Sequence, residues 1–180
     1  MSDQIIDQMT HEEFFAYVAL HPDKHFDFMD GEVVEVSPKP VHGYIQAKLA
    51  SILDLWLEST QSGYVFTEVL HVLNGKRFMP DVSINHDLAM DQSHFDSPPL
   101  LAVEIRSDSQ SRVAQRRKAL DYIERGTPAV LLIMPGEQIE LFTQDTGDDP
   151  IVFTSGEVVE NIPGLDGLKI DTKRLFRKAT

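Results

Sequence analysis

Two acidic residues stand in apolar segments where a carboxylate is costly. Asp81 follows Pro80 in the run Met79–Ile84, and Glu104 lies within the run Leu101–Ser107. A carboxylate inside an apolar strand is strongly destabilising unless it is paired, hydrogen-bonded or bound to a metal ion. On neighbouring strands, the two side chains would form a site of hard oxygen ligands, which suits Mg²⁺ or Mn²⁺.

Both acids also have an ordinary structural interpretation. Asp81 can be a turn or strand-end residue, because it directly follows a proline. Glu104 can form a salt bridge with Arg106 or Arg77. The flanking apolar residues of Glu104 face the opposite side of a strand, so its carboxylate needs a partner on its own side.

Basic residues follow Glu104 at spacings that bring them near it. Arg106 lies two positions later, so on an extended strand both side chains point the same way. Lys118 and Tyr122 are four positions apart in the next predicted helix, about 40° apart on one stripe. Lys118 is thus a candidate basic residue that completes the site of the two acids. The alternative is that Lys118 lies on the solvated face of a basic helix.

Three further polar residues are weaker candidates. Glu32 opens a predicted strand after an Asp-Gly turn and is a candidate third carboxylate on the metal side. His42 begins a long helix and is a candidate for substrate contact or proton transfer. Glu68 is another candidate strand acid. Glu32 and His42 have plain alternatives, as a glutamate beside a turn and a histidine at a helix start, and an ordinary structural role is also open for Glu68.

The elements that must position these residues follow from the hydrophobic periodicity. The pattern predicts helices over 11–20, 42–60, 111–125 and 172–177, and strands over 25–29, 32–37, 64–73, 78–85, 100–106, 128–134, 138–143, 151–153 and 157–161. The strand–helix–strand unit around 111–125 favours two parallel strands with a right-handed crossover. We expect a mixed sheet flanked by helices, of class α/β or α+β.

Composition limits the classes of protein. The chain has 180 residues, 42% of them hydrophobic, 25% charged and none cysteine, which is typical of one soluble globular domain over 1–180. Without cysteine there is no disulfide, no thiolate zinc site and no cysteine nucleophile. No apolar run reaches the length of a membrane span, and the first residues lack the pattern of a signal peptide, so we expect a cytoplasmic protein.

The charge balance bears on nucleic-acid binding. The formal net charge is −13, and a strongly acidic protein is repelled by phosphate backbones. This counts against tight, non-specific DNA binding. It leaves room for an enzyme that meets DNA locally, through a divalent metal ion and the basic run Arg112–Lys118. No phosphate-loop, dinucleotide-binding, nucleophile-elbow or zinc-helix motif occurs in the sequence.

A series of short motifs then matches a known family in order and spacing. The series comprises Asp30-Gly31-Glu32-Val33-Val34, Ser37-Pro38 with His42, Pro80-Asp81-Val82, Val103-Glu104-Ile105-Arg106-Ser107, Lys118-x-x-x-Tyr122-x-x-x-Gly126 and Ile162-Pro163-Gly164-Leu165. It resembles the Uma2 family (domain of unknown function 820), a branch of the PD-(D/E)XK, restriction-endonuclease-like superfamily. The resemblance covers nearly the whole chain.

The resemblance implies a restriction-endonuclease-like core and a metal site formed by Asp81 and Glu104, with Glu32 as a further acid. The superfamily carries a lysine two positions after the second acid, where this sequence has Arg106. The resemblance implies that Lys118 takes over that role from the following helix. Arginine does not readily give up a proton, so Arg106 is expected to bind a phosphate. His42 and Tyr122 complete the expected substrate contacts.

The sequence therefore favours a Mg²⁺-dependent nuclease that hydrolyses phosphodiester bonds, with DNA as its substrate. The alternative is a nuclease fold retained as a binding or assembly module with little catalysis. A sugar or small-ligand enzyme that uses paired carboxylates is a third hypothesis, for which the sequence offers no aromatic platform. We also expect a homodimer, because two cuts in a duplex are simplest with two-fold symmetry, and a bacterial source.

Overall fold

The computed structural model describes residues 9–22, 25–29, 32–36, 39–60, 63–107 and 111–176. The chain divides into two compact units, one of residues 1–39 with 107–109 and the other of residues 40–106 with 110–180. The first unit is small, and the second holds the large sheet and most of the core. That the whole chain is one domain stays a prediction.

The first unit contains a capped helix and a hairpin. The helix α1 (His11–Ala19) begins with the expected capping box, in which Thr10 Oγ1 accepts the Glu13 N–H at 3.3 Å and Glu13 accepts the Thr10 N–H at 2.8 Å. The strands β1 (His25–Met29) and β2 (Glu32–Val36) pair antiparallel, as predicted. The Asp30-Gly31 turn that joins them lies outside the described residues.

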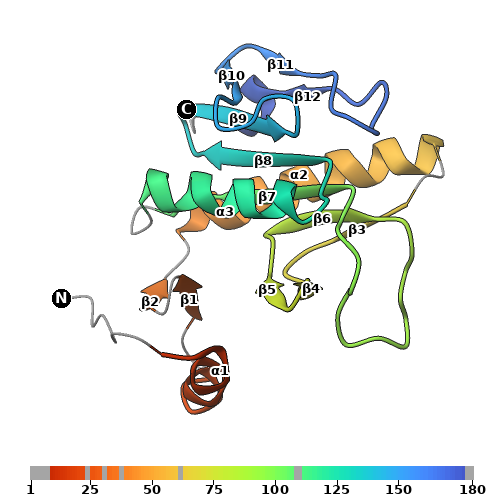
Figure 1. Ribbon diagram of the computed structural model, residues 1–180. Coiled ribbons are helices and arrows are strands. Elements are labelled where there is room, and N and C mark those ends of the chain that lie inside the picture. The colour runs from red at the N-terminus through yellow and green to blue at the C-terminus, as the bar shows by residue number, and fades with distance from the viewer. Residues whose placement is uncertain are drawn as a thin grey trace. The chain divides into compact units, whose positions relative to one another are not determined.

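The second unit is built on a six-stranded sheet with the order β10-β9-β8-β7-β6-β3 (Figure 1). Its strands are β3 (Tyr64–Phe66), β6 (Val82–Asn85), β7 (Leu101–Ile105), β8 (Ala129–Met134), β9 (Gln138–Thr143) and β10 (Ile151–Thr154). Only β7 and β8 run parallel within this sheet, and α3 (Arg112–Glu124) connects them. The predicted mixed sheet and its strand–helix–strand unit are thus confirmed.

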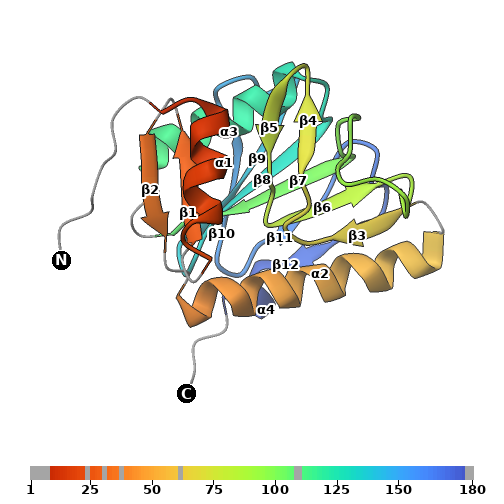
Figure 2. The same ribbon diagram turned by 90° about the horizontal axis from the view of Figure 1, so that it is seen from below.

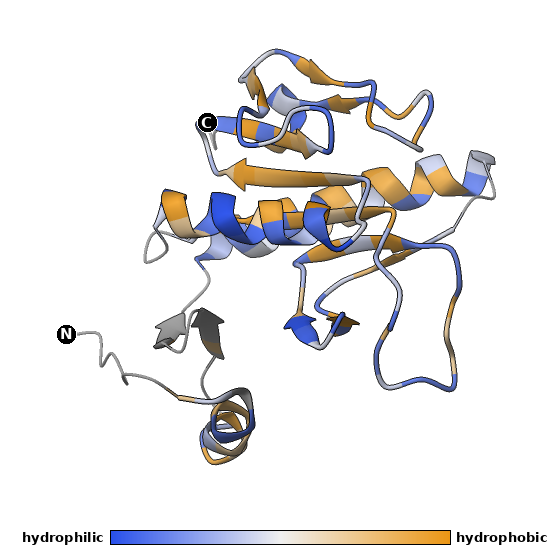
Figure 3. Ribbon diagram, viewed as in Figure 1, coloured by the Kyte–Doolittle hydropathy of each residue, from blue (hydrophilic) through white to orange (hydrophobic). Residues whose placement is uncertain are grey.

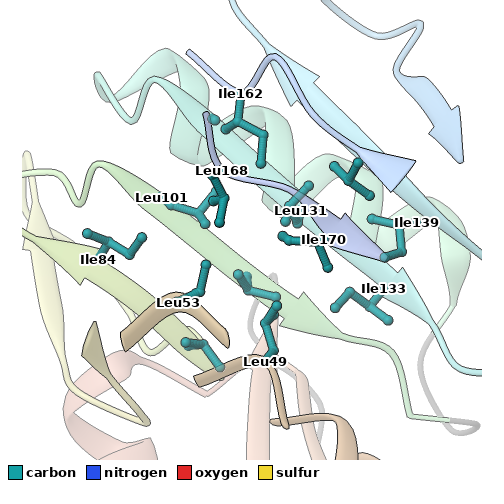
Figure 4. Close-up of a cluster of buried hydrophobic side chains, with 14 of the residues drawn as sticks. Leu49, Leu53, Ile84, Leu101, Leu131, Ile133, Ile139, Ile162, Leu168 and Ile170 are labelled. Atoms are coloured by element: carbon teal, nitrogen blue, oxygen red, sulfur yellow. The ribbon is translucent and has the colours of Figure 1, made fainter. Parts of the chain in front are cut away.

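Two helices cover opposite faces of this sheet, as Figure 2 shows for α2 (Pro40–Thr60) and α3. The buried residues Ile45, Leu49, Leu53 and Leu57 of α2 recur every four residues and pack on alternate strand residues (Figure 4). On β7, Leu101, Val103 and Ile105 belong to this core, whereas Ala102 packs on the α3 side with Ala119. Glu104 therefore faces α3.

The hydropathy of the elements agrees with this layering. In Figure 3, β8 is apolar along its whole length, whereas α3 is largely hydrophilic. All residues of β7 and β8 are buried, as expected for the central strands of a covered sheet. Among the described residues, no helix is long and apolar enough to cross a membrane.

The two long strands predicted over 64–73 and 78–85 are wrong as continuous strands. The chain forms β3 and β6 in the large sheet and a separate hairpin of β4 (His71–Leu73) and β5 (Lys76–Phe78) around Asn74-Gly75. Glu68 interrupts the first strand with a φ of 55°. Pro80 interrupts the second, because proline has no N–H to donate to a strand neighbour.

The C-terminal segment adds β11 (Val158–Val159), β12 (Ile170–Asp171) and the short helix α4 (Thr172–Leu175). The strand β12, which pairs with β11, was not predicted. Its neighbours Ile162, Leu165 and Leu168 are buried in the same core as α2. Figure 4 shows Leu168 close to Leu101 and Leu131, on the same apolar face of the sheet as Leu49 and Leu53.

Candidate active site

Asp81, the residue directly before β6, stands opposite Glu104 of the neighbouring strand β7. Val82 of β6 pairs antiparallel with Val103 of β7, so the next pair outward is Asp81 and Glu104. Residues that face each other across an antiparallel pair lie close together. The structure therefore brings the two predicted acids to the same end of the β6–β7 pair.

Asp81 is held by hydrogen bonds on both carboxylate oxygens. The main-chain N–H of Ile105 donates to Oδ2 at 2.6 Å, and Nε2 of His42 lies 3.1 Å from Oδ1. The carboxylate can only accept, so the imidazole is the donor in this contact. Asp81 is thus tied to the strand that carries Glu104 and to the first turn of α2.

Three carboxylates influence the pKa of the His42 imidazole. Its hydrogen bond to Asp81 raises the pKa of His42 above the usual range, and the charges of Asp81, Glu68 and Glu104 add to this effect against the opposing effect of burial. Among the described residues, its other ring nitrogen, Nδ1, is buried and has no hydrogen-bond partner. His42 is therefore within electrostatic reach of three acids.

Glu104 is nearly buried, with 4% of its surface exposed, and its two oxygens have different donors. Lys118 Nζ donates to Oε2 at 2.8 Å, and the Tyr122 hydroxyl donates to Oε1 at 2.8 Å. Lys118 is itself mostly covered, with 17% of its side chain exposed. The helix stripe that the sequence indicated for Lys118 and Tyr122 thus faces Glu104 and is not a solvated surface.

Within the part of the chain that the structure describes, the contacts of Arg106 go to Ile133 and Glu137, and not to the two acids. Its main-chain N–H donates to the Ile133 carbonyl at 2.9 Å, so the pairing of β7 with β8 continues one residue further. One terminal nitrogen lies 3.6 Å from Glu137 Oε1, and the buried Nε has no hydrogen-bond partner in the described chain. The salt bridge considered for Glu104 with Arg106 is replaced by the Lys118 contact.

Gln46 links two acids at this site and was missed by the sequence analysis. Its Nε2 donates to Glu68 Oε1 at 3.1 Å and to the Asp81 main-chain carbonyl at 3.0 Å. Glu68 is an exposed residue at a strand break, where its N–H donates to the Pro80 carbonyl at 3.2 Å. The signal that identifies Gln46 is its spacing, since it follows His42 by one helical turn.

Glu32 belongs to the other compact unit of the chain. It is the first residue of β2, opposite Met29, within the small N-terminal unit. Its side chain lies outside the described residues. A role for Glu32 as a further acid stays a prediction.

The sequence of the chain was compared with models of protein families. A family model described as "Putative restriction endonuclease" matches residues 11–173. The chain belongs to the Uma2 family. Among curated proteins, no sequence matches this Uma2 chain.

Solved structures support the fold of this Uma2 protein. One is described as "a putative nuclease belonging to DUF820 from Anabaena variabilis ATCC 29413". It superposes with a TM-score of 0.74 over 86% of this chain and 90% of its own, at 20% sequence identity. The shared fold confirms the predicted nuclease-like architecture, a mixed sheet flanked by helices.

The acid pair of the Uma2 chain fits a hard divalent cation in its donor chemistry. Magnesium is commonly bound by one or two carboxylates, with water and substrate phosphates completing its shell. Asp81 and Glu104 offer two such carboxylates, and the described residues contain no cluster of three or more His, Cys, Asp and Glu side chains arranged for a metal. A set of two carboxylate ligands is typical of a Mg²⁺ or Mn²⁺ site.

Proposed function

We propose that this Uma2 protein is a nuclease that hydrolyses phosphodiester bonds of DNA with the help of Mg²⁺ or Mn²⁺. The observation that carries the proposal is the contact of Lys118 with Glu104 directly opposite Asp81. Two acids and a lysine are the set that the PD-(D/E)XK superfamily uses. Here the lysine comes from α3, as the motif order implied, instead of from the strand of the second acid.

Asp81 and Glu104 would hold the cation. A bound cation would lower the pKa of the attacking water and offset the negative charge of the scissile phosphate. Both carboxylates are fixed in place before any cation arrives, because Ile105 holds Asp81 and Tyr122 holds Glu104. Preorganised ligands of this kind reduce the cost of assembling the site.

The remaining residues act on the substrate and on the proton. Lys118 orients the attacking water from the Glu104 side and stabilises the charge that develops on the phosphate. Arg106, whose guanidinium stays charged and is partly exposed, binds a phosphate oxygen through its terminal nitrogens. His42 keeps Asp81 in position and holds a proton on Nε2.

The experiment is a cleavage assay with paired variants. Supercoiled and linear DNA are incubated with Mg²⁺, Mn²⁺ or a chelator, using the wild-type chain, Asp81→Ala, Glu104→Ala and, as a control, Glu58→Ala at an exposed position of α2. We expect metal-dependent cleavage in the wild type and the control, and none in the other two variants. Cleavage that survives in both Asp81→Ala and Glu104→Ala removes the assignment.

One observation favours a second function, that of a nuclease fold kept as a binding or assembly module. Every carboxylate oxygen of Asp81 and Glu104 accepts a hydrogen bond from the protein. The two carboxylates therefore have hydrogen-bond partners without a cation. Thermal melting with Mn²⁺ separates the two functions. A saturable rise in melting temperature that disappears in Glu104→Ala supports the nuclease, and no rise supports the module.

The proposal includes a homodimer, because a two-fold pair of sites cuts both strands of a duplex in the simplest way. Light scattering of the protein with and without a short duplex measures the mass of the assembly. A mass of twice the monomer, with one duplex bound per dimer, agrees with the proposal. A monomer at all concentrations in both conditions contradicts it.

A further inference from the structure

A second buried carboxylate lies at the same level of the sheet as Glu104. Glu104 of β7 pairs with Leu132 of β8, and Leu132 pairs with Glu140 of β9. Residues that pair in this way across neighbouring strands lie on the same face, so Glu104 and Glu140 both face α3 with one leucine between them. Glu140 has no exposed surface.

Glu140 accepts hydrogen bonds from three side chains. Arg116 donates to both of its oxygens at 2.7 Å, Arg112 donates to Oε1, and Gln138 Nε2 donates to Oε1 at 2.8 Å. Burial disfavours the charge on Glu140, but the hydrogen bonds from the two arginines outweigh this and keep its pKa below the usual range. The carboxylate is therefore ionised and fully engaged at neutral pH.

These contacts change the meaning of the basic run Arg112–Lys118. Two of its cations neutralise Glu140, and Lys118 neutralises part of Glu104. Their charges are thus paired with buried carboxylates, although the side chains of Arg112 and Arg116 stay partly exposed. The run is not a free phosphate-binding patch, which agrees with the net charge of −13.

The two glutamates hold α3 from its two flanks. At about 100° per residue, the residues that face the sheet follow one another around an arc of about 160° in the order Lys118, Tyr122, Gln115, Ala119, Arg112 and Arg116. The first two bind Glu104, and the last two bind Glu140. In the middle of the arc, Gln115 is buried and its amide has no hydrogen-bond partner among the described residues.

Polar contacts at the two flanks therefore fix the rotation of α3 about its own axis. If the helix turned toward β7, the arginines would leave Glu140 as a buried and uncompensated charge, which is strongly disfavoured. If it turned toward β9, Lys118 and Tyr122 would leave Glu104 in the same state. The two sets of contacts oppose each other and define one orientation of the helix.

We propose that Glu140 is a positioning residue for the Lys118–Glu104 pair, and that it acts by binding Arg112 and Arg116 and so fixing α3. Its effect on DNA cleavage rests on the proposed function, whereas its effect on Lys118 does not. The strand β8 separates Glu140 on β9 from Glu104 on β7, so Glu140 acts on the Lys118–Glu104 pair only through α3.

The experiment measures how accessible the Lys118 amine is, which needs neither metal nor activity. The full chain is acetylated with an amine-reactive ester, and the rate at each lysine is followed by mass spectrometry. The variants are Glu140→Gln, which removes the charge at nearly constant volume, and Arg116→Lys, which keeps a charge but loses the two-pronged contact. Glu160→Gln, which removes the exposed partner of Lys169, is the matched control.

We expect Glu140→Gln to raise the acetylation rate of Lys118 several-fold while the rate at Lys48, a half-buried lysine on α2, stays constant. Arg116→Lys should give a smaller rise at Lys118, and Glu160→Gln none. An unchanged Lys118 rate in a folded Glu140→Gln chain overturns the proposal, as does an equal rise at Lys48, which reports general loosening. If Glu140→Gln does not fold, the rate at Lys118 in Arg116→Lys decides in the same way.

The cleavage assay adds a second measurement. If the wild type cuts DNA, Glu140→Gln should lower kcat by about 10- to 100-fold, the scale of a small misplacement of a catalytic group, with KM nearly unchanged. An equal change in KM, or no change in kcat, contradicts the positioning role. A wild type without cleavage removes the proposed function and leaves the acetylation result to judge Glu140 alone.

Discussion

Asp81 accepts a hydrogen bond from the main-chain N–H of Ile105 at 2.6 Å, and Ile105 is the residue that follows Glu104. The first acid is therefore attached to the backbone that carries the second. A side chain bound to a central, fully buried strand has little freedom to move. The spacing of the two carboxylates is set by this bond and by the pairing of β6 with β7.

Replacing Asp81 should cost stability as well as activity. In Asp81→Ala, the Ile105 N–H loses its acceptor and His42 loses its partner, so we expect the free energy of unfolding to fall by about 1–3 kcal/mol. Urea denaturation followed by circular dichroism measures the change. Asp54→Ala, at an exposed position of α2, is the control and should stay close to the wild type. A fully stable Asp81→Ala chain would show that the bond to Ile105 contributes nothing.

His42 should stabilise the fold more in acid than in base. Its hydrogen bond to Asp81 raises its pKa above 6.5, the value for the free side chain. A raised pKa means that the folded state binds the proton more tightly, so the stabilisation is fully present below 6.5 and is lost as the pH rises through the folded-state pKa. We expect the stability difference between wild type and His42→Gln to shrink over that range.

Denaturation is measured at closely spaced pH values from about 5 to about 9. This range covers the pH values at which histidines titrate and extends about one unit above them. A difference that grows as the pH rises contradicts the predicted direction. The same series on Asp81→Asn is informative, because it removes the carboxylate that raises the pKa. In that background, His42→Gln should have little pH-dependent effect.

His71 should behave in the opposite way. It is fully buried, stacked on Phe95 with ring centroids 5.1 Å apart and hydrogen-bonded to Asn85, and burial lowers its pKa below 6.5. The folded state therefore disfavours the proton, and stability is lost as the pH falls below 6.5 toward the folded-state pKa. We expect His71→Gln to be less stable than wild type at pH 8 but to lose less stability in acid. An identical acid slope in both chains contradicts this.

The elements of the fold were largely predictable because each has a local cause. The capping box at Thr10 fixed the start of α1, and the periodic leucines of α2 showed which face it buries. The apolar runs of β7 and β8, separated by a helix, predicted the parallel pair. The break at Glu68 was not predictable, because a positive φ at a glutamate depends on distant contacts such as its bond to Pro80.

The site was predictable only in part, for a related reason. Glu104 stood out because an acid in an apolar strand must have a partner, and the helix stripe of Lys118 and Tyr122 supplied one. Glu140 sits in an equally apolar strand, but its two arginines lie far away in the sequence and resembled a solvated face. Only the strand register places Glu140 level with Glu104.

The Tyr122 hydroxyl should contribute to stability through Glu104. Tyr122→Phe removes a hydrogen bond to a buried carboxylate and adds no volume, so we expect a loss of about 1.5–3 kcal/mol in the free energy of unfolding. Urea denaturation measures it. Tyr44→Phe on α2 is the matched control, because Tyr44 is half-exposed and its hydroxyl should matter by less than about 0.5 kcal/mol. Equal losses in the two variants would mean that the hydrogen bond to Glu104 does not add to the free energy of unfolding.

Lys118 should compete with a divalent cation for Glu104 while it assists the reaction of the proposed nuclease. Its ammonium occupies Glu104 Oε2 at 2.8 Å, so a cation that binds this carboxylate must displace or share that contact. In Lys118→Met, we expect Mn²⁺ to bind roughly tenfold more tightly, from the loss of one charged hydrogen bond, and DNA cleavage to disappear. Calorimetry with Mn²⁺ measures the affinity. Lys118→Arg keeps the competing charge and should show no tightening, and Lys48→Met controls for the loss of a positive charge elsewhere. Weaker Mn²⁺ binding in Lys118→Met would mean that the lysine supports the metal site and does not compete with it.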